Sequence, residues 1–189
     1  AGKSSRMQSI KQIEQIDNKY LLEIILKRLK ESFKNLILCV LGANETIIRK
    51  KINIKNIHFV SNKNFNDGLS SSIVTGVKYL LNNFNNYKGV LIVLGDQPGI
   101  DSLYFREMME LFTCNSDKII ASQYNNKIGV PAIFPKCKFD ELLKLKGDVG
   151  AKLLLNNNKE EIIFPKTKTN LIDIDTKENL KNYIKNYTK

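Results

Sequence analysis

The chain has 189 residues, the usual size of one domain, and its 42% hydrophobic and 26% charged residues form a globular composition that argues against disorder. No apolar run approaches the roughly 20 residues of a membrane helix, so we expect no membrane association. The net charge is +11, but the lysines are scattered and no nucleic-acid-binding motif accompanies them, so we expect a solvated basic surface and no nucleic-acid partner.

In the first half of the chain, the spacing of apolar residues predicts helices that alternate with buried strands. It predicts a helix over residues 20–33, strands over 36–41 and 57–60, a helix over 70–81 and a strand over 89–96. The helix over 70–81 begins with serines, which commonly cap a helix N-terminus. The strands are continuous apolar runs, as expected where both faces of a parallel sheet are covered.

The second half continues this alternation. The pattern predicts strands over 118–122, 130–134, 161–164 and 170–175, and helices over 101–112, 139–145, 150–157 and 177–187. No linker or internal repeat interrupts the series. The sequence therefore predicts a single domain over residues 1–189, a three-layer α/β/α sandwich with a largely parallel sheet.

Acidic residues follow two of the predicted strands, at the edge where ligands of such folds bind. Asp96, at the tip of an apolar strand, is well placed to hold Mg²⁺ together with phosphates, while a turn or helix cap ahead of Pro98 is the alternative. Asp173 and Asp175 alternate along a predicted strand, so at most one can point into a site. We choose Asp175, with capping of the last helix as its alternative.

The first seven residues, AGKSSRM, have the chemistry of a phosphate-binding loop. They offer a flexible glycine, hydroxyls and backbone N–H groups that can converge on phosphate oxygens. Lys3, Arg6 and Lys11 can neutralise the phosphate charge. Residues 2–4 also match the end of a P-loop, with residues 91–96 as its Walker B strand, so a P-loop ATPase or kinase is an open alternative.

Two further loops with glycines lead into predicted helices. Residues 67–72, DGLSSS, offer three hydroxyls and free N–H groups to a phosphate or a base edge, although capping the helix needs only one serine. Residues 147–152, GDVGAK, form the second loop, and a plain connection is the alternative there.

The single histidine and the three cysteines limit the chemistry. His58 lies within a predicted strand and is interpreted as a packing residue. A Ser-His-Asp enzyme or a His-rich metal site is therefore nearly excluded, unless His58 itself is the base. Cys39, Cys114 and Cys137 lie far apart without a CxxC pair, which argues against a zinc site or a disulfide framework. The cytoplasm is the simplest compartment for such a chain.

Taken in order, these motifs resemble the molybdenum cofactor cytidylyltransferase branch of the MobA-like nucleotidyltransferases. AGKSSRM with Lys11 corresponds to the family's LAAGxSSRMGxxK. The further matches are Gly68 with Ser70 to Ile73 and Gly76, GDQP at 95–98, Gly129 with Pro131 and Phe134, GDVGA at 147–151, and DIDTKE at 173–178. They span almost the whole chain, and a P-loop protein is not expected to show the last four. The resemblance implies a GT-A-like, Rossmann-type α/β/α fold.

The resemblance also implies a reaction. The terminal phosphate of a pterin cofactor, molybdopterin or molybdenum cofactor, attacks the α-phosphate of a nucleoside triphosphate, typically CTP, and pyrophosphate leaves. A molybdenum hydroxylase is then a candidate partner that receives the product. Because the attacking group is already an anion, positioning and charge neutralisation matter more than a strong base. A sugar or alditol phosphate as the acceptor keeps the same fold and is the alternative.

The family's functional residues carry over where the motifs match. The resemblance implies that Mg²⁺ is held by Asp96 with Asp175 assisting, that Arg6, Lys11 and Asp96 are catalytic, and that acceptor binding falls to Gln97, Asp148 and Lys152. It implies a nucleotide site made of Ala1, Gly2, Ser4, Ser5, Arg6, Lys11, Gly68, Ser72 and Asp96.

The sequence departs from the family pattern at three places. Gln8 replaces a usual glycine, which makes the loop stiffer there. Val130 stands where this branch often has His, which bears on the acceptor or base preference. The family's first strand would precede Ala1, so we expect the natural protein to begin roughly ten residues earlier, enough for a short strand and its start.

Overall fold

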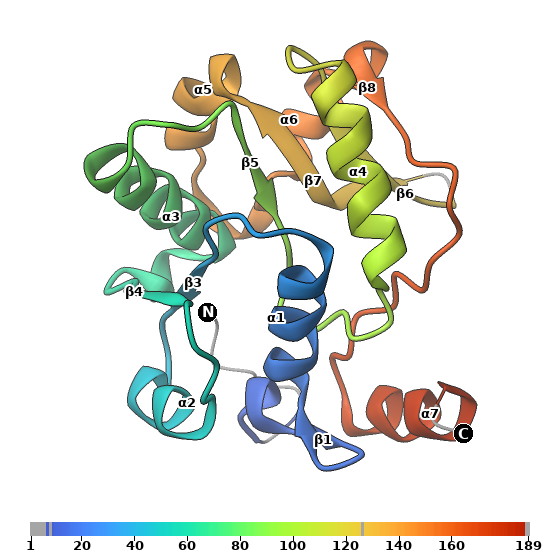
Figure 1. The fold of residues 1–189 in the computed structure, drawn as a ribbon. Helices are drawn as coiled ribbons and strands as arrows, with labels where there is room; N and C mark the ends of the chain where they lie inside the picture. The colour runs from blue at the N-terminus through green and yellow to red at the C-terminus, as the bar shows by residue number, and fades with distance from the viewer. Residues whose placement is uncertain (1–6, 8, 126, 188–189) are drawn as a thin grey trace.

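The computed structural model describes residue 7 and residues 9–125 and 127–187 (Figure 1). Its helices are α1 (Leu21–Ser32), α2 (Glu45–Lys51), α3 (Leu69–Asn83), α4 (Ser102–Cys114), α5 (Phe139–Leu143), α6 (Lys152–Asn157) and α7 (Lys177–Tyr187). Its strands are β1 (Gln15–Ile16), β2 (Lys19–Tyr20), β3 (Leu38–Leu41), β4 (His58–Ser61), β5 (Gly89–Ile92), β6 (Ile119–Tyr124), β7 (Lys127–Pro135) and β8 (Ile162–Ile163). None of the described helices combines the length and apolar character that a membrane span needs.

Four strands form the main sheet in the order β5-β7-β6-β8, in which β7 is antiparallel to both neighbours and β8 is parallel to β6. β3 and β4 pair in parallel beside it, and β1 and β2 form a small hairpin. The α/β fold class is confirmed, with one correction: the sheet is mixed rather than largely parallel. Only residues 125–126 separate β6 from β7, and a connection that short cannot cross over to a parallel strand.

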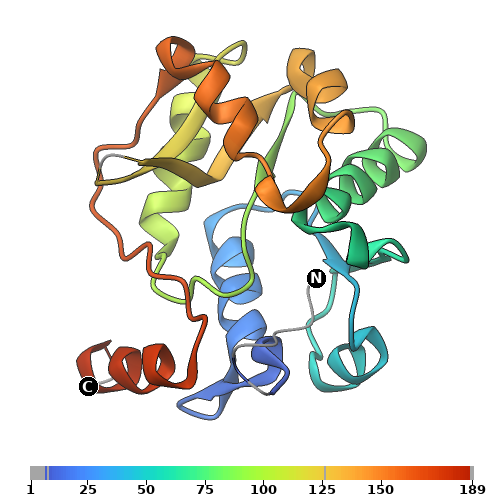
Figure 2. The same ribbon diagram turned by 180° about the vertical axis from the view of Figure 1, so that it is seen from behind.

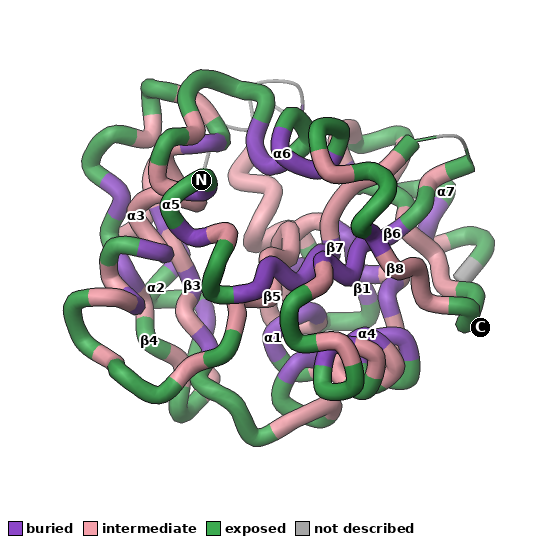
Figure 3. Tube along the Cα trace, turned by 90° about the horizontal axis from the view of Figure 1, so that it is seen from above, coloured by how far each residue is buried: buried purple, intermediate pink, exposed green. Residues whose placement is uncertain are grey.

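Two hydrophobic clusters lie on opposite faces of the main sheet. α1 and α4 cover one face, and α3, α5 and α6 cover the other (Figures 1 and 2). Alternate residues of β7 supply both clusters, since Ile133 joins the first while Ala132 and Phe134 join the second. Buried positions run along β6 and β7 between these helices (Figure 3). The described layers are those of an α/β/α sandwich.

The predicted elements and the observed ones differ mainly where little apolar surface is buried. α2 was not predicted because its polar sequence buries only Ile48. The predicted strand over 170–175 is wrong, since the segment has no strand assignment. Ile174 is its one buried residue, and Ile172 is exposed. β5 is half-buried at every position and is an edge strand of the described sheet; a further strand before Ala1 stays a prediction.

Candidate functional site

Lys11, Asp96 and Asp175 meet in one ion-paired group. The Nζ atom of Lys11 lies 2.6 Å from Oδ2 of Asp96 and 2.8 Å from Oδ1 of Asp175. The side chains of Lys11 and Asp96 are 14% and 19% exposed, whereas that of Asp175 is 44% exposed. The group is therefore accessible to a ligand mainly beside Asp175.

The backbone brings the two aspartates together. The N–H of Ile174 donates to the carbonyl of Asp96 at 2.9 Å. The Ile174 side chain is fully buried in a third hydrophobic cluster, with Met7, Ile16, Leu21, Leu180 and Tyr183. This cluster holds the segment from Asp173 to Asp175 beside Asp96, which lies in the loop after β5.

Helix capping, the alternative role for both aspartates, falls to other residues. α4 is capped by Asp101, whose carboxylate accepts from a backbone N–H of the first turn at 2.9 Å. At the start of α7, the hydroxyl of Thr176 accepts from the N–H of Asn179 at 3.0 Å. Asp96 lies in a turn, as the alternative interpretation expected. Its carboxylate and that of Asp175 nevertheless bind a cation, the Lys11 ammonium.

Burial and the neighbouring charges change the pKa values of Lys11 and Asp173. Burial alone would lower the pKa of the Lys11 ammonium, but the attraction of Asp96 and Asp175 outweighs it, so this pKa is raised. Burial and the nearby charge of Asp96 raise the pKa of Asp173, although a hydrogen bond from Gln97 opposes the change. Lys11 thus stays charged between the two carboxylates at neutral pH.

The carboxylates fit a divalent cation that is shared with a phosphate ligand. Oδ1 of Asp96 is buried and has no hydrogen-bond partner among the described residues. Mg²⁺ usually takes one or two protein carboxylates and completes its shell with phosphates and water. In the described part of the chain, no three His, Cys, Asp or Glu side chains group into a metal cage. Asp96 and Asp175 would therefore hold Mg²⁺ as part of a metal–phosphate complex.

Gln97 lies inside the protein rather than at an open surface. Its side chain is 1% exposed, and Nε2 donates to the hydroxyl of Tyr124 at 2.7 Å and to Oδ1 of Asp173 at 2.8 Å. Tyr124 in turn donates to the carbonyl of Val130. The structure thus makes Gln97 an internal support of the site, and its contact with an acceptor stays a prediction.

Arg28 holds the loop that follows Asp96. From α1, its guanidinium donates to the carbonyl of Pro98 and to that of Ile100, the latter at 2.7 Å. This role has no signal in the sequence, because Arg28 resembles any other charged residue of an amphipathic helix. The same hydrogen bonds tie α1 to the segment that carries the candidate metal ligand.

The serine loop is organised by Asn62, a buried residue that the sequence analysis also missed. Its Nδ2 donates to Oγ of Ser71 at 2.9 Å and to Oγ of Ser72 at 3.1 Å, and its Oδ1 accepts from the N–H of Asn64 at 2.9 Å. Its position directly after β4, at the carboxyl end of a strand, is the signal that could have found it.

The two glycine-containing loops lie against each other. Gly68 has φ +92°, and a Cβ there would meet the backbone of Gly147 and Oδ1 of Asp148 at 2.5 Å. Oδ1 of Asp148 accepts from the N–H of Leu69 at 3.3 Å. Lys152 is exposed nearby at the start of α6. The predicted nucleotide loop and the predicted acceptor loop are therefore neighbours, while the substrate contacts of Gly68, Ser72, Asp148 and Lys152 stay predictions.

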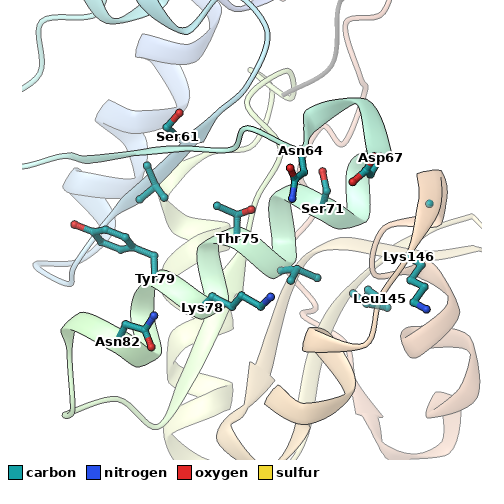
Figure 4. Close-up of a pocket in the computed structure, with 13 residues that line it drawn as sticks. Ser61, Asn64, Asp67, Ser71, Thr75, Lys78, Tyr79, Asn82, Leu145 and Lys146 are labelled. Carbon is teal, nitrogen blue, oxygen red and sulfur yellow. The ribbon is translucent and has the colours of Figure 1, made fainter.

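A cavity of about 680 Å³ lies between α3, the end of β4 with the loop after it, and residues 145–147 (Figure 4). It shares Asp67 and Ser71 with the serine loop, but neither Lys11 nor Asp96 lines it. Its other polar lining residues are Ser61, Asn64, Thr75, Lys78, Tyr79, Asn82 and Lys146. The cavity thus adjoins the predicted nucleotide loop without including the ion-paired group.

The first residues of the predicted phosphate loop lie outside the described part of the chain. This concerns Ala1, Gly2, Ser4, Ser5 and Arg6, together with Gln8. Two residues near the end of that loop are described. Met7 lies in the third hydrophobic cluster, and Lys11 lies in the ion-paired group. The phosphate-binding roles of the other residues stay predictions.

Comparison with known proteins places this site in a family context. The profile of a family described as "MobA-like NTP transferase domain" matches residues 1–162. A search of curated proteins found no match. The matched range includes the phosphate loop, Asp96 and the GDVGAK loop, and ends before Asp175.

Several solved structures share the fold. An Rv0371c homolog from Mycobacterium sp. strain JC1 is 22% identical, with a TM-score of 0.82 over 98% of this chain and 91% of that one. Rv0371c from Mycobacterium tuberculosis H37Rv, in complex with manganese, is 18% identical with a TM-score of 0.76, covering 95% and 94%. A 4-diphosphocytidyl-2C-methyl-D-erythritol synthase from Anaerococcus prevotii DSM 20548 is 15% identical with a TM-score of 0.67, covering 90% and 87%. At these identities the likeness concerns the fold alone.

Proposed function

The chain belongs to the family of MobA-like NTP transferase domains, and on this premise we propose that it is a Mg²⁺-dependent cytidylyltransferase of molybdopterin or the molybdenum cofactor. The observation that supports a metal-dependent site is the meeting of Asp96 and Asp175 on one cation, the Lys11 ammonium. The manganese complex of the M. tuberculosis protein, which has the same fold, agrees with this proposal. A molybdenum hydroxylase that accepts the product is the proposed protein partner.

In the proposed reaction, an oxygen of the acceptor's terminal phosphate bonds to the α-phosphorus of CTP. The bond from that phosphorus to the bridging oxygen breaks, and pyrophosphate leaves with the electron pair. Bound Mg²⁺ would supply charge neutralisation at the phosphates. The protein needs no general base, because the nucleophile is already an anion. This agrees with the position of His58, which is exposed on β4 and packs edge-on against Phe84.

Lys11 has a second proposed role in this scheme. Its ammonium neutralises Asp96 and Asp175 in the described structure. In this scheme Asp96 and Asp175 would hold Mg²⁺, and the ammonium of Lys11 would then bind the triphosphate instead of the carboxylates. Cationic and N–H groups aimed at phosphate oxygens stabilise the charge that develops in phosphoryl transfer. We therefore assign Lys11, with Arg6, to charge neutralisation rather than to proton transfer.

Replacement of Asp96 by Asn tests this function. We expect pyrophosphate release from CTP and molybdopterin to fall at least about 100-fold, because an amide neither carries the charge nor binds Mg²⁺ as a carboxylate does. Asp140→Asn, on the exposed side of α5, is the matched control and should retain activity. Full turnover by Asp96→Asn would overturn the metal assignment.

The acceptor is tested separately. A sugar or alditol phosphate is the second candidate, supported by the fold shared with the A. prevotii synthase. Pyrophosphate release is measured with CTP, GTP, ATP and UTP, each against molybdopterin and against a panel of sugar and alditol phosphates. Release with CTP and molybdopterin alone supports the proposal, and release only with an alditol phosphate would move the assignment to that class. The P-loop alternative is set aside, because the chain belongs to a different family.

A further inference from the structure

The pairing of β6 with β7 contains an irregularity close to the site. Ala121 pairs with Ala132, but the next residue, Ser122, pairs with Gly129. Val130 and Pro131 are therefore extra residues on β7, and their carbonyls are displaced from the regular ladder. Bulges of this kind redirect side chains and are frequent beside active sites.

Two side chains of β6 bind the displaced carbonyls. The hydroxyl of Ser122 donates to the carbonyl of Pro131 at 2.8 Å, and the hydroxyl of Tyr124 donates to that of Val130. Ser122 is fully buried, and Tyr124 is half-buried. Burial also raises the pKa of the Tyr124 hydroxyl, so it remains a donor at neutral pH. The bulge thus fixes the position of the Tyr124 oxygen.

The Tyr124 oxygen in turn fixes Gln97. Because the only hydroxyl proton of Tyr124 is donated to Val130, this oxygen accepts from Nε2 of Gln97 at 2.7 Å. The other proton of Nε2 goes to the Asp173 carboxylate at 2.8 Å. Both contacts require a donor, which settles the orientation of the Gln97 amide. Its Oε1 is buried without a partner among the described residues.

We infer that Gln97 and Tyr124 are positioning residues, which hold the segment of Asp173 to Asp175 at a set distance from Asp96. We call the connected series Val130–Tyr124–Gln97–Asp173 the polar strut. The segment has no strand pairing of its own. Besides the strut, it is held by the hydrogen bond from Ile174 to Asp96, by the burial of Ile174, by the Lys11–Asp175 ion pair and by the N–H of Asp175, which donates to Oδ1 of Asn179 at 3.3 Å. The strut fixes the Asp173 end of this segment and so helps to set where Asp175 lies, and its effect on metal binding rests on the proposed function.

Tyr124→Phe removes one oxygen and breaks the strut at its centre. The amide of Gln97 loses its fixed partner, the carbonyl of Val130 loses its donor, and the segment at Asp175 gains freedom relative to Asp96. Residues that orient metal ligands typically change metal affinity by about 10–100-fold when mutated. We expect Tyr124→Phe to weaken Mn²⁺ binding about tenfold, and to raise the Mg²⁺ concentration needed for half-maximal activity more than it lowers kcat.

Tyr104→Phe provides the matched control. Tyr104 is also a buried tyrosine beside β6, and its hydroxyl donates to Oγ of Ser122 at 2.8 Å. It has no described hydrogen bond to Gln97 or Tyr124, and Tyr104→Phe leaves the donation from Ser122 to the carbonyl of Pro131 in place. Both variants lose a buried hydroxyl, so both should lose a similar amount of thermal stability. Only Tyr124→Phe should change the affinity for Mn²⁺, which separates positioning from a purely structural role.

Two measurements on the full chain decide the matter. Mn²⁺ titration followed by electron paramagnetic resonance gives the metal affinity, and amide hydrogen exchange at Ile174 gives the mobility of the segment. Tyr124→Phe should raise exchange at Ile174, and Tyr104→Phe should not. Unchanged Mn²⁺ affinity and unchanged exchange in Tyr124→Phe would overturn the inference while leaving the proposed function intact. If the native chain binds no Mn²⁺ but Tyr124→Phe still raises exchange, the strut is supported and the proposed function fails.

A second variant covers the case in which Tyr124→Phe does not fold. A Cβ at Gly129 would lie 2.9 Å from Cε2 of Tyr124, so Gly129→Ala pushes the ring aside while keeping its hydroxyl. We expect the same direction of change in Mn²⁺ affinity and in exchange at Ile174. Native values for both quantities in Gly129→Ala would overturn the inference.

Discussion

At the scale of single residues, Lys11 balances the charge of the site. It is paired with one carboxylate that is mostly buried and another that is nearly half exposed. Removing one member of a buried ion pair is costly because the remaining charge is left uncompensated, whereas an exposed pair contributes little. Lys11 lies between these cases, so replacing it should lower the free energy of unfolding by a measurable amount. The size of this loss should depend on whether another cation is present to bind the carboxylates.

Lys11→Met should lower metal-free stability by about 2 kcal/mol, an estimate between the exposed and buried limits. For a chain of this size the melting temperature should fall by about 4–8 °C. Added Mg²⁺ should restore more stability in Lys11→Met than in the native protein, since the ammonium no longer competes for the carboxylates. Thermal melts with and without Mg²⁺ check this, with Lys27→Met, which breaks the exposed Lys27–Glu23 pair, as control. Equal responses of native and variant protein to Mg²⁺ would contradict it.

At the scale of elements, the segment between β8 and α7 is held by side chains rather than by a sheet. Glu107 of α4 accepts from the N–H groups of Lys166 and Thr167 at 2.7 and 2.8 Å. Burial alone would raise the pKa of Glu107, but these hydrogen bonds outweigh it and lower the pKa below its usual 4.5. α4 thus fixes the route by which the chain returns to the site.

The lowered pKa of Glu107 makes a pH-dependent prediction. Its stabilisation is present above the unfolded-state pKa and is lost as the pH falls through the lower folded-state pKa. Glu107→Gln should therefore cost about 1 kcal/mol at pH 7, allowing for solvent exposure. The difference from the native protein should shrink below about pH 4.5. Urea unfolding at several pH values measures this, and Glu110→Gln on the same helix is the control. A pH-independent difference would contradict the prediction.

At the scale of the whole molecule, the third hydrophobic cluster joins the two ends of the described chain. Met7, near the start, shares this cluster with Ile174 and with Leu180 and Tyr183 of α7. The site residues Lys11 and Asp175 follow members of this cluster in the chain, four positions after Met7 and directly after Ile174. The folding of the C-terminal helix and the assembly of the site are therefore coupled.

Leu180→Ala tests this coupling. Truncation of a buried leucine should cost about 2–3 kcal/mol and lower the melting temperature by about 5–10 °C. Mn²⁺ affinity should also fall, because the substitution opens a void in the cluster that buries Ile174. Leu154→Ala, buried in the second cluster on α6, should cost similar stability without affecting Mn²⁺. An equal loss of Mn²⁺ affinity in both variants would show a general effect of stability instead.

The fold was largely predictable where local periodicity carries the information. The amphipathic patterns of α1, α3 and α4 and the apolar run of β6 predicted these elements, because each buries one continuous face or run. β7 was predicted only in its second half, since its exposed start has no apolar signal. Its direction depends on a short connection, and the segment over 170–175 depends on packing against distant residues. A local sequence pattern therefore predicts neither the direction of β7 nor the structure of residues 170–175.

The site was predictable in part for the same reason. Position after a strand pointed to Asp96, and the motif spacing pointed to Lys11 and Asp175, which the structure brings together. Their roles in catalysis stay predictions. Arg28, Asn62 and Tyr124 escaped notice because their importance lies in contacts with residues 9 to 72 positions away in the chain. A single sequence does not show such pairs, although the position of Asn62 directly after β4 marks it as a candidate.

The pairing of Lys11 with two carboxylates has a consequence for the order of binding. An ammonium tethered to the chain has a high effective concentration at these oxygens, so free sodium or potassium ions compete with it poorly. A triphosphate offers Lys11 another anionic partner and so draws it away from Asp96 and Asp175. Nucleotide arrival and the opening of the carboxylates to a divalent ion are then one coupled event. We therefore expect monovalent cations to bind poorly at these carboxylates, and a divalent ion to bind more tightly together with the nucleotide than alone.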